Sequence, residues 1–296
     1  MREPSKYLST IILALVGSLF ASEFVVAHCG SGTICACSDP PDGEQNYKQG
    51  RWFVIGTDNF QICCDESETL ALGLARHAET LRRELREKWL GSASSARWVP
   101  KCQVVLHSSR RSYTAAIGRG SERTVGSSFV NVTAGVIRGR RIDLLGGQTE
   151  FLTAALPHEL THVVLKDRFP SVQLPRWADE GMAMLADTEA KQVRHRIDLR
   201  KALAQRTTFN LAALVTMEEY PRSDRWGTFY GESVSLTEFL VEQGSPRHFV
   251  RFIDRAITKG YDAALRECYG VEGVAELDRE WRQQLNAKQL ASNQDG

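Results

Sequence analysis

The pattern of apolar residues changes near residue 148, and this change limits the folds open to the chain. Before it, short runs rich in β-branched and aromatic residues are separated by turn-forming residues, as strands are. After it, apolar residues recur almost continuously at helical spacing. The sequence therefore predicts an α+β protein. A mixed sheet lobe with a long helix is expected at residues 51–148, followed by a mostly helical lobe at residues 149–290, and the two lobes are expected to form one unit.

The expected strands of the first lobe are bounded by glycine and other turn-forming residues. They are Trp52–Gly56, Phe60–Cys63, Gln103–His107, Ser128–Val132 and Arg141–Leu145. Between the second and third strands, large apolar residues recur at helical spacing from Leu70 to Trp89. Ser67 is placed to cap this helix and Gly91 to end it.

In the second lobe, prolines mark helix starts, because proline fits the first helical turn. We expect this of Pro175 and Pro246. A stripe at helical spacing marks the last helix and consists of Val274, Leu277, Trp281 and Leu285.

The first 27 residues have the three parts of an export signal. Arg2 and Lys6 precede an apolar run from Ile11 to Ala21, and small residues precede a cleavage point after Ala27. The run is too short to span a bilayer comfortably. An uncleaved membrane anchor is the alternative. We expect a protein exported to the periplasm or the extracellular space, with no membrane contact beyond the signal itself.

Export affects the interpretation of the cysteines, because an oxidising compartment allows disulfides to persist. Residues 28–50 hold three of the seven cysteines and lack apolar periodicity, so we expect an irregular lead-in. Disulfides are expected to tie it to the sheet lobe, with at least one cysteine left over because the count is odd. The pairing stays open, and a metal clip is the alternative. The cysteines are Cys29, Cys35, Cys37, Cys63, Cys64, Cys102 and Cys268.

The charges of the chain nearly cancel, since 37 basic and 36 acidic side chains give a formal net charge of +1. This balance does not indicate a nucleic-acid partner, which would require a strongly basic surface. The basic run Arg82 to Lys88 lies on the expected long helix, and we interpret it as the solvated face of that helix. The oligomeric state is left open by these features.

Residues 157–162 read PHELTH, an HExxH pattern on an expected helix. Four residues are just over one helical turn, so His158 and His162 project from one face and can share a tetrahedral ion, with Glu159 offset toward a bound water. The pattern is a signature of zinc metalloproteases. Pro157 indicates either that the helix begins here or that it kinks just before the ligands.

A second expected helix supplies an acid. In the run LPRWADEGMA, Glu180 stands directly before Gly181. Its carboxylate would complete a ligand set with His158 and His162 and leave a fourth position for water. Gly181 has no side chain, so this helix could approach the first one closely. Asp179 is the alternative third ligand.

These two motifs resemble those of the gluzincin metallopeptidases, and within them the bacterial peptidase MA-like group. The shared residues are HELTH and PRWADEGMA, and weaker similarity extends over about residues 50–285. The resemblance implies a zincin-like fold with the zinc site between the two lobes, and one zinc ion per chain. It also implies that the third zinc ligand is the glutamate of the second helix, here Glu180.

A third match, FYGE at the start of an amphipathic helix, contains Tyr230. It is similar to the tyrosine-bearing helix start of aminopeptidase-type gluzincins, which implies that the phenol donates to the oxyanion of the tetrahedral intermediate. The alternative is a buried tyrosine packed against the zinc helices. His195 could be a second donor, although we interpret it as a surface histidine. His77, His107 and His248 are weaker candidates still for a role in the site.

The motifs and the resemblance together predict a secreted zinc metallopeptidase acting on a peptide or protein substrate. Zinc activates a water, and Glu159 takes its proton as the water attacks the peptide carbonyl, then passes it to the leaving amine. Arg141–Leu145 is the expected edge strand for holding the substrate. The Gly-Ala-Met-Glu-Asn motif of the aminopeptidase branch is missing, which favours an endopeptidase.

Two other classes of protein stay open. A catalytically inactive peptide-binding protein would be expected to have lost the base or a ligand, yet all four residues are present. An envelope protein whose zinc only braces two helices would need a closed site with a fourth protein ligand, and the sequence offers no evident one.

Overall fold

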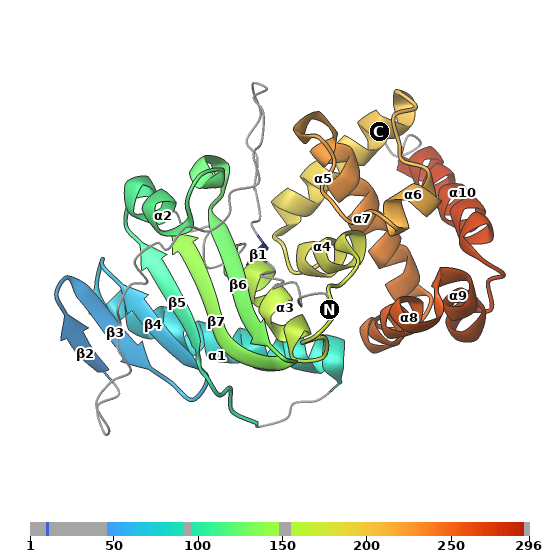
Figure 1. Ribbon diagram of the computed structural model, residues 1–296. Coiled ribbons are helices and arrows are strands. Elements are labelled where there is room, and N and C mark those ends of the chain that lie inside the picture. The colour runs from blue at the N-terminus through green and yellow to red at the C-terminus, as the bar shows by residue number, and fades with distance from the viewer. Residues whose placement is uncertain (1–9, 12–45, 92–95, 148–154, 293–296) are drawn as a thin grey trace, which may run out of the picture. The chain divides into compact units, whose positions relative to one another are not determined.

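The computed structural model describes residues 10–11, 46–91, 96–147 and 155–292 (Figure 1). The chain divides into two compact units, the first ending at Gln173 and the second beginning at Leu174, with Lys88–Leu90 grouped with the second. The division thus falls after Gln173 rather than near residue 148. The physical reason is that the helix carrying the HExxH pattern packs on the sheet of the first unit.

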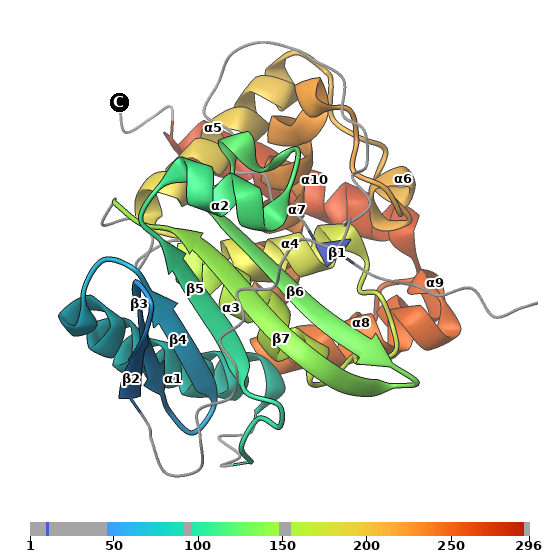
Figure 2. The same ribbon diagram turned by 60° about the vertical axis from the view of Figure 1, so that its left-hand side comes forward.

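The first unit is built on a mixed seven-stranded sheet with the order β1-β6-β7-β5-β4-β3-β2 (Figure 2). β4 and β5 are parallel, as are β5 and β7, whereas the other neighbours are antiparallel. The strands are β1 (Thr10–Ile11), β2 (Asn46–Gln49), β3 (Trp52–Gly56), β4 (Phe60–Cys64), β5 (Cys102–His107), β6 (Gly126–Thr133) and β7 (Val136–Leu145). Every strand expected from the sequence is confirmed.

The helices of the first unit are α1 (Glu68–Leu90), α2 (Arg110–Ile117), the 3-10 helix η1 (Ser121–Arg123) and α3 (Leu156–Lys166). α1 begins and ends as the sequence predicts. The Ser67 side chain accepts a hydrogen bond from the Leu70 backbone N–H, and Gly91 ends the helix in the left-handed region with φ 65°. Both views show α1 and α3 on the same face of the sheet (Figures 1 and 2).

Two expectations about strands need correction. Residues 46–49, expected in the irregular lead-in, form β2, which pairs with β3 along its whole length. Arg141–Leu145 is not an edge strand, because β7 lies between β5 and β6. A tight turn at Ala134 and Gly135, both with positive φ, connects β6 to β7, and the two strands pair antiparallel. The strand outside β7 is therefore β6, and the two-residue β1 pairs along part of its far side.

The basic run on α1 is only in part a solvated face, because Arg83 is exposed whereas Arg82 and Arg86 are enclosed. Arg82 is only 5% exposed, and its guanidinium lies 4.5 Å from the centroid of the Trp98 ring. Arg86 forms an ion pair with Asp167, the residue that follows α3. Arg140 of β7 pairs with the same carboxylate at 2.9 Å. Arg86 and Arg140 are enclosed because they join α1 and β7 to the end of the HExxH helix.

The second unit is helical in the described residues. Its elements are α4 (Arg176–Met184), α5 (Glu189–Ala204), α6 (Leu211–Val215), the 3-10 helix η3 (Ser223–Arg225), α7 (Trp226–Glu242), α8 (Pro246–Lys259), α9 (Tyr261–Tyr269) and α10 (Val274–Ser292). Pro246 begins α8 as expected, whereas Pro175 stands one position before α4. The α10 stripe is confirmed as core, with Leu277 and Trp281 each 1% exposed.

α7 packs against both α4 and α5, and glycines allow these close approaches. A Cβ at Gly181 of α4 would lie 2.0 Å from Oγ1 of Thr237, and one at Gly231 of α7 would lie 2.9 Å from the backbone oxygen of His195. The expectation that Gly181 serves an approach to the HExxH helix therefore needs correction, because the contact that it allows is with α7.

The expected export signal falls outside the described residues except for Thr10–Ile11, and so do Cys29, Cys35 and Cys37. Within the described ranges, no disulfide joins Cys63, Cys64, Cys102 or Cys268 to one another. Disulfides between the lead-in and the sheet unit thus stay a prediction. No helix within these ranges combines the length and the apolar character needed to cross a membrane.

Candidate metal centre

α3 is a buried helix that carries polar side chains. Every residue from Leu156 to Lys166 is buried. α3 is assigned from Leu156, so Pro157 stands in its first turn, where the missing N–H of proline is tolerated. Histidine and glutamate side chains are seldom buried without a partner or an ion. The concentration of these side chains on one enclosed helix therefore indicates a functional site.

His158 and His162 lie one turn apart on α3, and each is 2% exposed. Their ring centroids are 5.1 Å apart, and the ring planes meet at 69°. The two imidazoles therefore project from the same face of the helix, as their spacing predicts.

Glu159 is fully buried and is held by a residue of β6. The Ser128 hydroxyl donates a hydrogen bond of 2.7 Å to Oε2 of Glu159. Gly126, two residues earlier on the same strand, leaves room for this carboxylate, since a Cβ there would lie 2.8 Å from Oε1. The position of Glu159 is thus fixed by β6 as well as by its own helix.

Glu180 lies on α4 and is 1% exposed. The Tyr220 phenol, from the segment between α6 and η3, donates a hydrogen bond to its Oε1. Burial, and then the nearby charge of Glu180, raises the pKa of Tyr220 well above its usual range, so the phenol keeps its proton and acts as a donor. Tyr220 is a site residue that the sequence does not reveal, because its segment carries no motif.

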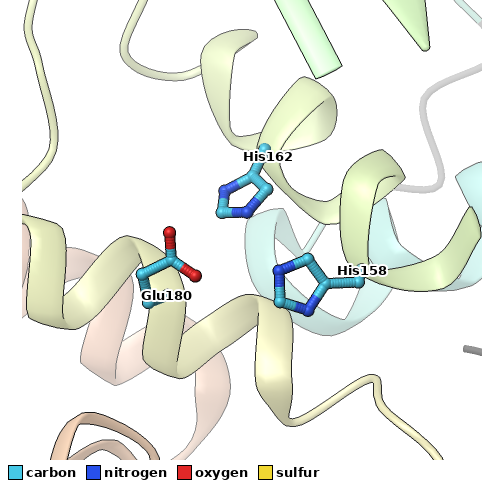
Figure 3. Close-up of side chains that lie close together, drawn as sticks. All are labelled: His158, His162 and Glu180. Carbon is cyan, nitrogen blue, oxygen red and sulfur yellow. The ribbon is translucent and has the colours of Figure 1, made fainter. Parts of the chain in front are cut away.

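The possible ligand atoms of His158, His162 and Glu180 all lie within 4.8 Å of one another (Figure 3). Two imidazole nitrogens and one carboxylate oxygen are a donor set that zinc uses, with bonds of about 2.0–2.2 Å. Asp179, the alternative third ligand, is not in this group. The donors present therefore fit a single zinc ion.

Tyr230 lies in the second turn of α7 and packs against two rings. Its ring centroid is 5.4 Å from that of Phe229 and 6.1 Å from that of His195. His195 is not a surface histidine, because α5 turns it toward α7 and leaves its side chain only 12% exposed. Its Nε2 lies 3.8 Å from Oδ2 of Asp187. These contacts explain the packing of Tyr230, and its oxyanion role stays a prediction.

Glu232 follows Tyr230 in the third match but belongs to the helical core. It is fully buried, and its Oε2 accepts a hydrogen bond of 2.9 Å from the Phe209 backbone N–H. Burial raises the pKa of its carboxyl to about 7. This acid supports the connection before α6 and is not part of the metal group.

His107 and His248 have partners that account for them. His107 Nε2 lies 2.8 Å from Oδ1 of Asp143, and His248 Nε2 lies 2.7 Å from the backbone oxygen of Cys268. Burial alone would raise the pKa of Asp143, but hydrogen bonds from His107 and Arg141 outweigh it and hold that pKa below its usual value. Neither histidine joins the candidate metal centre.

An α+β chain with a buried HExxH helix is the arrangement expected of a metal-dependent peptidase. A family model of the peptidase MA superfamily matches residues 122–287, which is more than half of the 296-residue chain. The matched stretch contains both α3 and α4. The chain therefore belongs to the peptidase MA superfamily, as its motifs predict. A comparison with the curated proteins found no match.

Proposed function

We propose that this protein is a zinc metallopeptidase of the gluzincin type, with one zinc ion bound by His158, His162 and Glu180. The observation that carries the proposal is the grouping of their ligand atoms within 4.8 Å in a chain of the peptidase MA superfamily. When bound, zinc would supply Lewis-acid chemistry, polarising a water and the carbonyl of the substrate.

Glu159 is the general base in this proposal. Its carboxylate takes a proton as water attacks the peptide carbonyl and then gives that proton to the leaving amine. The hydrogen bond from Ser128 keeps the carboxylate in one orientation, so it does not have to be ordered during the reaction. Tyr230 is proposed to donate its phenol proton in a hydrogen bond to the developing oxyanion.

β6 is the strand that we propose to hold the substrate. It lies outside β7 in the described sheet, and it carries the residue that contacts Glu159. On its outer side it pairs with β1 at Ser128 and Phe129. β1 belongs to the segment that we propose to be removed as an export signal, and its removal would expose this edge for pairing with an extended peptide.

The proposal includes secretion and cleavage at internal peptide bonds. Both rest on the sequence, through the tripartite N-terminal segment and the missing aminopeptidase motif. The rival functions are a catalytically inactive peptide-binding protein and a zinc-braced envelope protein.

Metal analysis of the purified protein, combined with digestion of a mixed peptide library, separates these functions. We expect about one zinc per chain and cleavage at internal bonds, which a chelator abolishes and added zinc restores. Zinc without cleavage would favour the braced protein. A wild-type protein that binds no zinc would contradict the proposal.

A further inference from the structure

We propose that Tyr220 is a positioning residue for the metal, which orients the carboxylate of Glu180 and thereby strengthens metal binding. The inference rests on the proposed function, since it assigns a role toward the zinc ion that Glu180 would hold. It adds a residue that no motif of the sequence marks.

The geometry at Glu180 is the first argument. A carboxylate on a flexible side chain can present either oxygen, and a metal ligand must present one in a fixed direction. The Tyr220 phenol donates to Oε1 of Glu180. This bond holds the carboxylate in one orientation, so its ligand oxygen would not have to turn to meet an ion.

The second argument is that the phenol is itself held in place. The Tyr220 ring meets the Phe229 ring edge-on, with centroids 5.8 Å apart. The guanidinium of Arg176 lies 4.4 Å from the centroid of the same ring, and it is anchored by donating to the backbone oxygen of Glu218. A donor fixed on both sides can orient a ligand at little entropic cost.

Tyr220 and Tyr230 should therefore differ in effect. Tyr220 donates to the proposed ligand, whereas the Tyr230 ring packs against the rings of Phe229 and His195. Removing the Tyr220 hydroxyl should weaken zinc binding. Removing the Tyr230 hydroxyl should lower kcat and leave zinc affinity unchanged.

The experiment measures the zinc dissociation constant by competition with a chromophoric chelator, on the full protein, for wild type and Tyr220→Phe. Loss of an outer-shell partner typically weakens metal binding by about 10–100-fold, and we expect a change in this range. Tyr261→Phe is the matched control, because it removes another part-buried phenol, one that donates to the Val215 backbone oxygen at 2.8 Å. The control should bind zinc within about twofold of wild type.

A double-mutant cycle with Glu180→Gln tests whether the effect passes through Glu180. In that background Tyr220→Phe should change zinc affinity little further. The inference is overturned if Tyr220→Phe binds zinc as tightly as wild type, if Tyr261→Phe weakens binding equally, or if the Tyr220 effect persists in full without Glu180. Wild-type protein that binds no zinc would instead remove the proposed function, and this inference with it.

Discussion

At the scale of single residues, Glu159 is already in position before a substrate arrives. Ser128 donates to one of its oxygens, and the absence of a side chain at Gly126 leaves space for the other. A base held by a strand of the sheet loses little orientational freedom in the transition state, which favours proton transfer.

Ser128→Ala should therefore lower kcat for peptide hydrolysis by about 10–100-fold, because a hydrogen bond to a charged group contributes about 1.5–3 kcal/mol. KM should stay nearly unchanged. Ser127→Ala is the control, since alternate residues of a strand face opposite sides of the sheet. Steady-state kinetics on one peptide substrate provides the measurement. Equal kcat values for Ser128→Ala and wild type would show that Ser128 does not position the base.

The sequence predicted the residues on α3 but not those that hold Glu159 and Glu180. The spacing of His158 and His162 is a local property of one helix, so it can be read without tertiary structure. Ser128 lies 31 residues from Glu159, and Tyr220 lies 40 residues from Glu180. Contacts over such separations are set by how the elements pack, which a single sequence does not encode in any spacing.

At the scale of elements, Asp167 joins three pieces of the first unit. Its side chain is 13% exposed and pairs with Arg86 of α1 and Arg140 of β7. The sequence pattern marked the arginines of α1 as exposed, because charge on a helix usually faces solvent. Arg86 pairs with Asp167 after α3, and Arg82 lies against the Trp98 ring, so the pattern of one helix could not show that these two side chains are enclosed.

Asp167→Ala should destabilise the protein by about 3–5 kcal/mol, because it leaves two largely enclosed arginines without their common partner. Urea unfolding followed by circular dichroism measures the loss. Asp224→Ala is the control, since its partner Arg222 is 86% exposed and such surface pairs contribute little. If the two variants unfold at the same urea concentration, the buried arginine cluster does not stabilise this unit.

At the scale of the whole molecule, the sequence predicted the α+β class, and the structure contains each of the five strands that the sequence predicted. It misplaced the boundary between the parts because helical periodicity shows that α3 is a helix, but not which neighbour it packs against. It also could not show that β6 lies outside β7, since the alternation of apolar and polar residues identifies a strand without giving its place in the sheet. Membership of the peptidase MA superfamily agrees with the two motifs that lie on α3 and α4.

The central claim is that Glu159 acts chemically in a zinc-dependent hydrolysis, and Glu159→Gln tests it most directly. The amide keeps the volume of the side chain and can still accept the hydrogen bond from Ser128, but it cannot take a proton. Zinc content and thermal stability should therefore match the wild type, while the peptide hydrolysis rate should fall by about 10²–10⁴-fold. A zinc-loaded Glu159→Gln protein that hydrolyses peptides within about threefold of the wild-type rate would contradict the account, because a general base cannot be removed at so small a cost.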